Sequence, residues 1–94
     1  MVLYGGVWKL IDQQWQRLSS TERQIMSYLT LKKDQVNLQQ LVNGLKSQVT
    51  FTEILTALES LQGRAVIKVC HDHFVQQPII RKYLKQKIFN HHNH

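Results

Sequence analysis

The hydrophobic pattern changes period near Gly63, and this change limits the folds that the chain can adopt. Before Gly63, apolar residues recur at helical spacing in four stretches. After it come two short runs, Ala65–Cys70 and Phe74–Gln76, whose β-branched and apolar residues are typical of strands. Because 94 residues can bury only one modest core, the pattern predicts a single, mainly helical domain with a small β-hairpin.

Capping signals locate the helices more closely. Ser19 with Glu22, and Thr50 with Glu53, each form a capping box, in which two side chains satisfy free backbone N–H groups at a helix start. Pro78 suits the first turn of a last helix, because its fixed φ matches the helix and its missing N–H is not needed there. We expect helices at 7–18, 20–31, 38–45, 50–62 and from 78 onward, with a short extended piece at 35–37.

This order of elements predicts a winged helix-turn-helix with one additional helix at its N-terminus and another at its C-terminus. The Gly5–Gly6 pair marks residues 1–6 as a flexible leading segment, residues 7–90 form the single domain, and residues 91–94 form a polar, histidine-rich tail. Apolar residues at the inward positions of these elements should form the core. We expect it to contain Leu18, Ile25, Met26, Leu29, Leu41, Leu55, Leu58 and Ile67.

Composition narrows the class of protein. With 43% hydrophobic and 19% charged residues, the chain is typical of a globular protein and not of a disordered one. No apolar run approaches the ~20 residues that a membrane span requires, and the start lacks the pattern of a signal peptide. The lone cysteine, Cys70, cannot form an internal disulfide, so we expect a cytoplasmic protein in which this side chain is packed or half-buried.

Two histidines, His71 and His73, flank an aspartate between the predicted strands. On a continuing strand they would share one face, as a pair of metal-binding imidazoles does. Two ligands are too few for a closed zinc site, and we therefore interpret this stretch as the solvated tip of the hairpin and predict no metal site. The other candidate ligands lie at no recognised spacing: Cys70, Asp72, His91, His92 and His94.

The sequence contains no catalytic signature. A phosphate-binding loop, a nucleophile elbow and paired carboxylates in an apolar setting are all missing, so we do not expect an enzyme. The net charge of +6 suggests the hypothesis of DNA binding instead. Winged helices bind DNA with their third core helix, here residues 50–62. That helix has no lysine or arginine and carries Glu53 and Glu59, so DNA binding is not favoured. The polar contacts that would serve this alternative are Thr52, Thr56, Ser60, Gln62 and Lys68.

Two other surfaces could meet a protein partner. After Asp72 every charged residue is basic, and the basic face of the last helix is either solvated or a docking surface for a neighbouring domain. Two tryptophans lie seven residues apart on the first helix, where they either pack on the core or form an aromatic patch through which the chain self-associates. The residues of these surfaces are Trp8, Trp15, Arg81, Lys82, Lys85 and Lys87.

Three stretches, LIDQQWQRLSSTERQIMSYL, ILTALESLQGRAVI and FVQQPIIRKYL, carry a family resemblance. Together they cover roughly residues 8–84 and resemble the winged-helix domain that follows the NB-ARC domain in bacterial, cyanobacterial-type STAND signalling ATPases, which often carry WD repeats. The resemblance implies a module that packs on the nucleotide-binding domain and moves when ADP is exchanged for ATP. It implies no cofactor in this chain and ADP or ATP on a neighbouring domain.

In that wider family a Met-His-Asp motif at the exit of the hairpin places a histidine near the phosphates of ADP. The comparable stretch here is Gln76–Gln77–Pro78, and the resemblance puts Gln77 in place of the histidine, with Arg81 on the same side. A glutamine amide can donate a hydrogen bond to a phosphate. The sequence thus predicts a non-catalytic regulatory module of a STAND-type ATPase; the alternative is a free-standing winged-helix transcription regulator that binds DNA.

Overall fold

The computed structural model describes residues 2–32 and 35–92, with side chains from Gly6 to Lys32 and from Gln35 to Ile88. Parts of the two predicted terminal segments, namely Met1, residues 93–94 and the side chains of His91 and His92, lie outside the described residues. The elements follow in the order α1 (Val2–Arg17), α2 (Ser20–Leu31), β1 (Val36–Asn37), α3 (Leu38–Leu45), α4 (Phe51–Gly63), β2 (Ile67–Cys70), β3 (His73–Gln76) and α5 (Pro78–His92).

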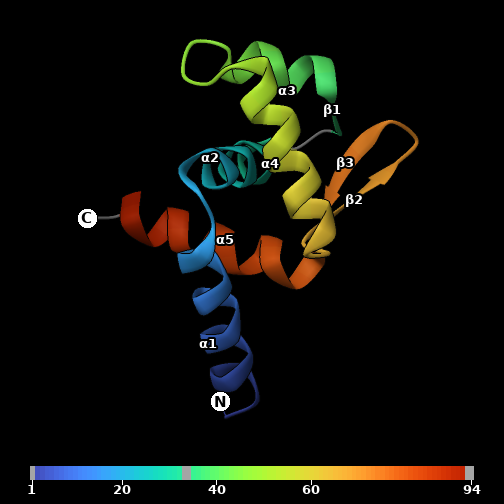
Figure 1. The fold of residues 1–94 in the computed structure, drawn as a ribbon. Helices are drawn as coiled ribbons and strands as arrows, with labels where there is room; N and C mark the ends of the chain where they lie inside the picture. The colour runs from blue at the N-terminus through green and yellow to red at the C-terminus, as the bar shows by residue number, and fades with distance from the viewer. Residues whose placement is uncertain (1, 33–34, 93–94) are drawn as a thin grey trace.

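The predicted fold class is confirmed: the chain is mainly helical with one small antiparallel sheet. The strands lie in the order β1-β3-β2, and β3 pairs with both neighbours, so that Phe74 faces Val36 on one side and Val69 on the other. Figure 1 shows α2, α3 and α4 grouped together, the β2–β3 hairpin beside them as a wing, and α1 projecting from this body. Among the described helices, none is both long and apolar enough to cross a membrane.

Capping boxes begin three of the helices. Ser19 accepts a hydrogen bond from the N–H of Glu22 at 3.1 Å while the Glu22 carboxylate accepts one from the N–H of Ser19 at 2.8 Å. Thr50 and Glu53 form the same pair at the start of α4. Both boxes were predicted. A third box, between Asn37 and Gln40, begins α3 and uses amide side chains in place of the hydroxyl and carboxylate.

The core lies where α2, α3, α4 and the wing meet. Seven of the eight predicted core residues are buried, and the exception is Leu55, which is 36% exposed. Leu55 lies between the inward positions Ile54 and Leu58 of α4, and therefore points toward solvent on a helix that buries only one face. The fully buried side chains that fill the centre are Ile25, Met26, Leu41, Ile54, Leu61 and Leu84.

The first helix begins earlier than its pattern indicated. Backbone from Val2 onward is helical, through Gly5 and Gly6, so the segment predicted as a flexible lead is the first turn of α1. Glycine costs a helix about 1 kcal/mol relative to alanine but does not stop it, and the segment contains no proline. Among the side chains of this helix that the structure describes, from Gly6 onward, the exposed apolar ones are Val7 and Leu10.

The junction between α4 and the wing places a left-handed residue where the sequence has alanine. Helix α4 ends at Gly63, as predicted, but no described glycine has a positive φ, whereas Ala65 has φ of 60°. The turn is closed by a hydrogen bond from the N–H of Val66 to the carbonyl of Leu61 at 3.2 Å. Strand β2 therefore begins at Ile67 and not at Ala65, as the β-branched run had suggested.

Replacing Ala65 with glycine should raise the free energy of unfolding by about 0.5–1 kcal/mol, because glycine adopts a left-handed conformation without steric cost. The reverse substitution two positions earlier, Gly63→Ala, should also be stabilising, by a similar amount. Alanine favours the helix more than glycine does, and no atom lies within 4 Å of the added Cβ. Urea titration followed by circular dichroism measures both. A loss of stability for Ala65→Gly would contradict the left-handed assignment.

The tip of the wing is a tight turn at His71 and Asp72. Their φ angles of 50° and 60° place both residues in the left-handed region, as the two central residues of a type I′ hairpin turn require. Both are exposed, whereas His73 belongs to β3 and is half-buried. The interpretation of His71–Asp72–His73 as a turn is thus confirmed for its first two residues.

Candidate functional site

The outward face of α4 is the surface with which a winged helix would meet a large partner. Phe51 is 52% exposed and lies one helical turn before Leu55, so the two form an apolar strip on the same face. Both acidic residues of α4, Glu53 and Glu59, are exposed as well. The backbone N–H of Thr50 donates a hydrogen bond to the Glu53 carboxylate and holds the pKa of Glu53 below its usual value, so Glu53 is ionised at neutral pH. This face is therefore apolar and acidic.

The polar residues predicted for DNA readout do not change that character. Most of them are exposed along α4, but Ser60 is half-buried, and Lys68 lies on the exposed side of the neighbouring strand β2. No arginine or lysine belongs to α4 itself. The helix α4 thus lacks the cations that form most contacts to DNA phosphates and guanine edges, and Lys68 is the one cation of the predicted set. The exposed members of the set are Thr52, Thr56, Gln62 and Lys68.

At the exit of the wing, two neighbouring glutamines have different surroundings. Gln76 is 7% exposed, and its amide nitrogen lies 3.0 Å from the carbonyl oxygen of Met26 and 3.0 Å from the hydroxyl oxygen of Thr30, both on α2. The side chain of Gln77 is exposed, while its backbone N–H donates to the carbonyl of Val66 at 3.1 Å. The resemblance pointed to Gln77, and this side chain is the one that is open to solvent.

The Arg81 side chain is used within the domain. Its guanidinium group donates to the backbone carbonyls of Leu29 at 2.9 Å and Lys32 at 3.0 Å, and to the amide oxygen of Gln76 at 3.2 Å. The last carbonyls of a helix have no partner within that helix, and a cation there also interacts favourably with the helix dipole. Arg81 therefore caps the C-terminal end of α2 from α5.

The other predicted surface residues divide between packed and exposed. Trp8 and Trp15 are both half-buried against the core: the Trp8 ring meets Tyr83 edge-on at 5.7 Å, and the guanidinium of Arg23 lies 5.5 Å from the Trp15 ring. Both tryptophans thus pack against the core, and they do not form an open aromatic patch. Val7 and Leu10 are instead the exposed apolar positions in the part of α1 whose side chains are described.

The basic residues of α5 differ in how closely they contact α1. Lys87 lies 3.7 Å from Asp12 and 5.8 Å above the ring of Tyr83, whose hydroxyl donates to the same Asp12 carboxylate. Burial and the carboxylate of Asp12 raise the pKa of Tyr83, which remains protonated and can act as this donor. Lys82 and Lys85 are exposed. The basic face thus serves in part to hold α5 against α1.

The wing does not assemble a metal site from the described residues. The Nδ1 atom of His73 lies 2.9 Å from the carbonyl oxygen of His71 and 3.3 Å from the Asp72 carboxylate, so its nearest partners are local. Among the side chains that the structure describes, residues 6–32 and 35–88, no group of three or more histidine, cysteine or acidic residues is close enough to hold a metal ion. Cys70 is exposed, which corrects the expectation of a packed thiol, because β2 buries only its first residue.

Comparison with known proteins found similarity to part of a much larger protein. No family model and no solved structure matches the chain. An uncharacterized WD repeat-containing protein of Nostoc sp. is 33% identical to it over 86 residues, which are 92% of this chain. The chain spans only 7% of the length of that relative. What the comparison establishes is that the chain is similar to a short segment of a WD repeat-containing protein.

Proposed function

We propose that the chain is a non-catalytic regulatory module of a STAND-type, NB-ARC-containing signalling ATPase in the cytoplasm. It packs on the nucleotide-binding domain, which holds ADP or ATP, and changes position with the nucleotide. The single observation that carries this proposal is the exposed surface of α4, where the apolar side chains of Phe51 and Leu55 are open to solvent and the only charged residues are the carboxylates Glu53 and Glu59. Charged residues are depleted and aromatic residues enriched at the centres of protein interfaces, whereas a DNA-reading helix carries cations.

The similarity to a segment of a WD repeat-containing protein supports a setting with further domains. In this setting the ADP state keeps the module packed against the nucleotide-binding domain, and exchange for ATP releases it as a rigid body. The contacts of Arg81 with α2 favour movement as one unit, because α5 and the core helices are joined by hydrogen bonds. The exposed side chain of Gln77 is the group that would face the nucleotide.

Gln77→Ala, made in a protein that joins this segment to its nucleotide-binding domain, should weaken ADP binding about tenfold or more, because one hydrogen bond to a charged group is worth about 1.5–3 kcal/mol, and should raise the basal ATPase rate. The backbone bond from Gln77 to Val66 does not depend on the side chain, so the wing should keep its place. Gln86→Ala, at an exposed position of α5, is the matched control and should change neither quantity. Unchanged ADP affinity for Gln77→Ala would remove the sensor role.

The alternative, a free-standing DNA-binding regulator, is tested with the chain itself. A labelled random duplex titrated with the chain should show weak binding at low salt, because of the net charge of +6, and none near physiological salt. Fluorescence anisotropy measures both conditions. Binding that persists at the higher salt would favour the regulator and would contradict a purely protein-facing module.

A further inference from the structure

A cavity of about 310 Å³ lies between α1, α5 and the junction that leads from α4 into the wing. Its volume is at the lower end of the range in which small-molecule sites fall, roughly 300–1,000 Å³. Ile11, Ile80 and Leu84 line it and are themselves buried, so these walls are held in place by the core. The space is therefore preformed by packed side chains, and Trp15 also lines it.

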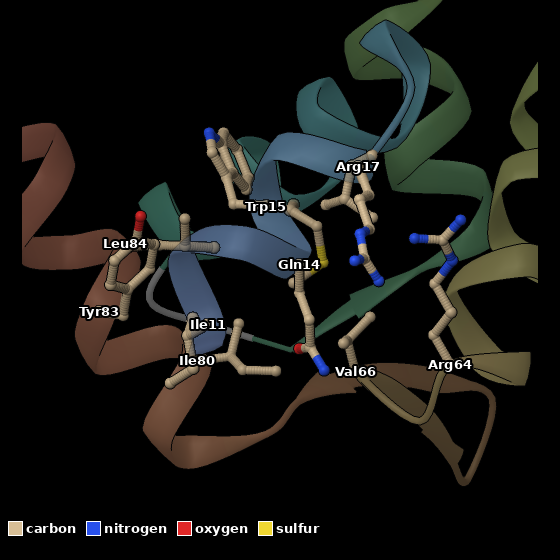
Figure 2. Close-up of a pocket in the computed structure, with 11 residues that line it drawn as sticks. Ile11, Gln14, Trp15, Arg17, Arg64, Val66, Ile80, Tyr83 and Leu84 are labelled. Atoms are coloured by element: carbon tan, nitrogen blue, oxygen red, sulfur yellow. The ribbon is translucent and has the colours of Figure 1, made fainter. Parts of the chain in front are cut away.

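The cavity has an apolar end and a cationic end. Figure 2 shows the aliphatic side chains of Ile11, Ile80 and Leu84 toward α5, and the guanidinium groups of Arg17 and Arg64 at the opposite side. Arg17 comes from the last turn of α1 and Arg64 from the residue after α4, so two separate segments bring these charges to one site. Both arginines are exposed, so a ligand that enters the cavity from solvent can reach their guanidinium groups.

The guanidinium groups retain their hydrogen-bonding capacity. Neither the Arg17 nor the Arg64 side chain forms a hydrogen bond or an ion pair within 4 Å with the rest of the described chain. Arg64 interacts electrostatically with Glu22, one of whose carboxylate oxygens accepts the N–H of Ser19 at 2.8 Å, while the other is buried without a hydrogen-bond partner among the described residues. A guanidinium group presents its donors in a planar fork that matches a carboxylate. Two such forks beside an apolar cavity suit an anion that carries an apolar chain.

We propose that this cavity binds a small carboxylic acid with an aliphatic chain of medium length, with the chain between α1 and α5 and the carboxylate at Arg17 and Arg64. Burial of the chain supplies the hydrophobic part of the affinity, and the two arginines select the ionised acid over a neutral analogue. This binding does not depend on nucleotide switching or on the outward face of α4, and its test leaves the proposed function untouched.

Octanoate, kept below its micelle concentration, is the probe for the isotopically labelled chain in an NMR titration. We expect saturable shifts at the Trp15 indole N–H and at the methyl groups of Ile11, Val66 and Ile80, all of which line the cavity. Octanol, the neutral analogue, should bind about tenfold more weakly, because it cannot form charge-assisted hydrogen bonds with the two arginines. The proposal is overturned if shifts fail to saturate, if they centre on the exposed Val7 and Leu10, or if octanol binds as tightly.

The double variant Arg17→Gln/Arg64→Gln tests the cationic end. It should weaken octanoate binding about tenfold or more and leave octanol binding unchanged, since the apolar walls remain. The matched control is Lys46→Gln/Lys68→Gln, which removes the same charge from exposed positions that do not line the cavity and should leave both affinities as they are. All four substituted positions are exposed, and the amide spectrum of each variant verifies the fold. An equal loss of octanoate affinity in both double variants would mean that only the net charge matters, and would overturn the assignment of the carboxylate to Arg17 and Arg64.

Discussion

Replacing Leu61 with alanine should lower the free energy of unfolding by about 2–5 kcal/mol, the range found for leucine-to-alanine changes in well-packed cores. Leu61 is fully buried in α4, and its carbonyl also closes the turn into the wing. Truncation removes the buried methyl groups and leaves a cavity that neighbouring side chains fill only in part. For a domain of this size the loss is a large fraction of the total stability, which is roughly 5–15 kcal/mol.

The matched control for this prediction lies on the same helix. Leu55→Ala makes the same chemical change at a side chain that is 36% exposed, so it should cost about 1 kcal/mol or less. Urea titration of both variants, followed by circular dichroism, gives the comparison. Equal losses in the two variants would mean that Leu55 contributes to the core as the sequence pattern had suggested, and would contradict the orientation of α4.

Gln76→Ala is the substitution with the second-largest expected effect, about 2–3 kcal/mol of lost stability. The buried amide of Gln76 bonds Met26 and Thr30 on α2 and accepts from Arg81 on α5, so it joins three elements at one point. Its removal leaves buried polar groups with fewer partners, and such groups are costly in an environment of low dielectric. Thermal and urea unfolding both measure the change.

The neighbouring residue again supplies the control. Gln77→Ala changes the same side chain one position later, where the amide is exposed, and should alter stability by no more than about 0.5 kcal/mol. Should Gln76→Ala prove as mild as Gln77→Ala, the hydrogen bonds to α2 would not be formed in solution. The pair also separates the structural glutamine from the one assigned to the nucleotide in the proposed function.

Local sequence signals predicted most of the fold. The two hydroxyl–glutamate capping boxes, the helical spacing before Gly63 and the β-branched runs after it are short-range features, and each element that they indicate is present. The start of α1 was missed because two glycines weaken a helix without ending it. The left-handed Ala65 was missed because glycine is the usual residue in that conformation, and the nearest glycine, Gly63, lies within the helix.

The candidate sites were harder to predict because they depend on contacts between distant segments. Nothing local to Arg81 indicates that its guanidinium reaches the end of a helix about fifty positions earlier, or that Gln76 is buried while Gln77 is not. The cavity likewise requires Arg17 and Arg64, which are far apart in the chain, to come together beside α5. Periodicity identifies which face of an element is apolar, but not which distant residue it meets.

The side-chain contacts between α1 and α5 fix the orientation of the first and last helices relative to each other. Trp8 and Asp12 on α1 both contact Tyr83 on α5, and Asp12 also pairs with Lys87. The chain therefore enters and leaves the domain through two helices braced against each other, as Figure 1 shows, and not through the wing or α4. Under the proposed function, domains joined to the two helices would keep their orientation relative to each other while α4 engages or releases a partner.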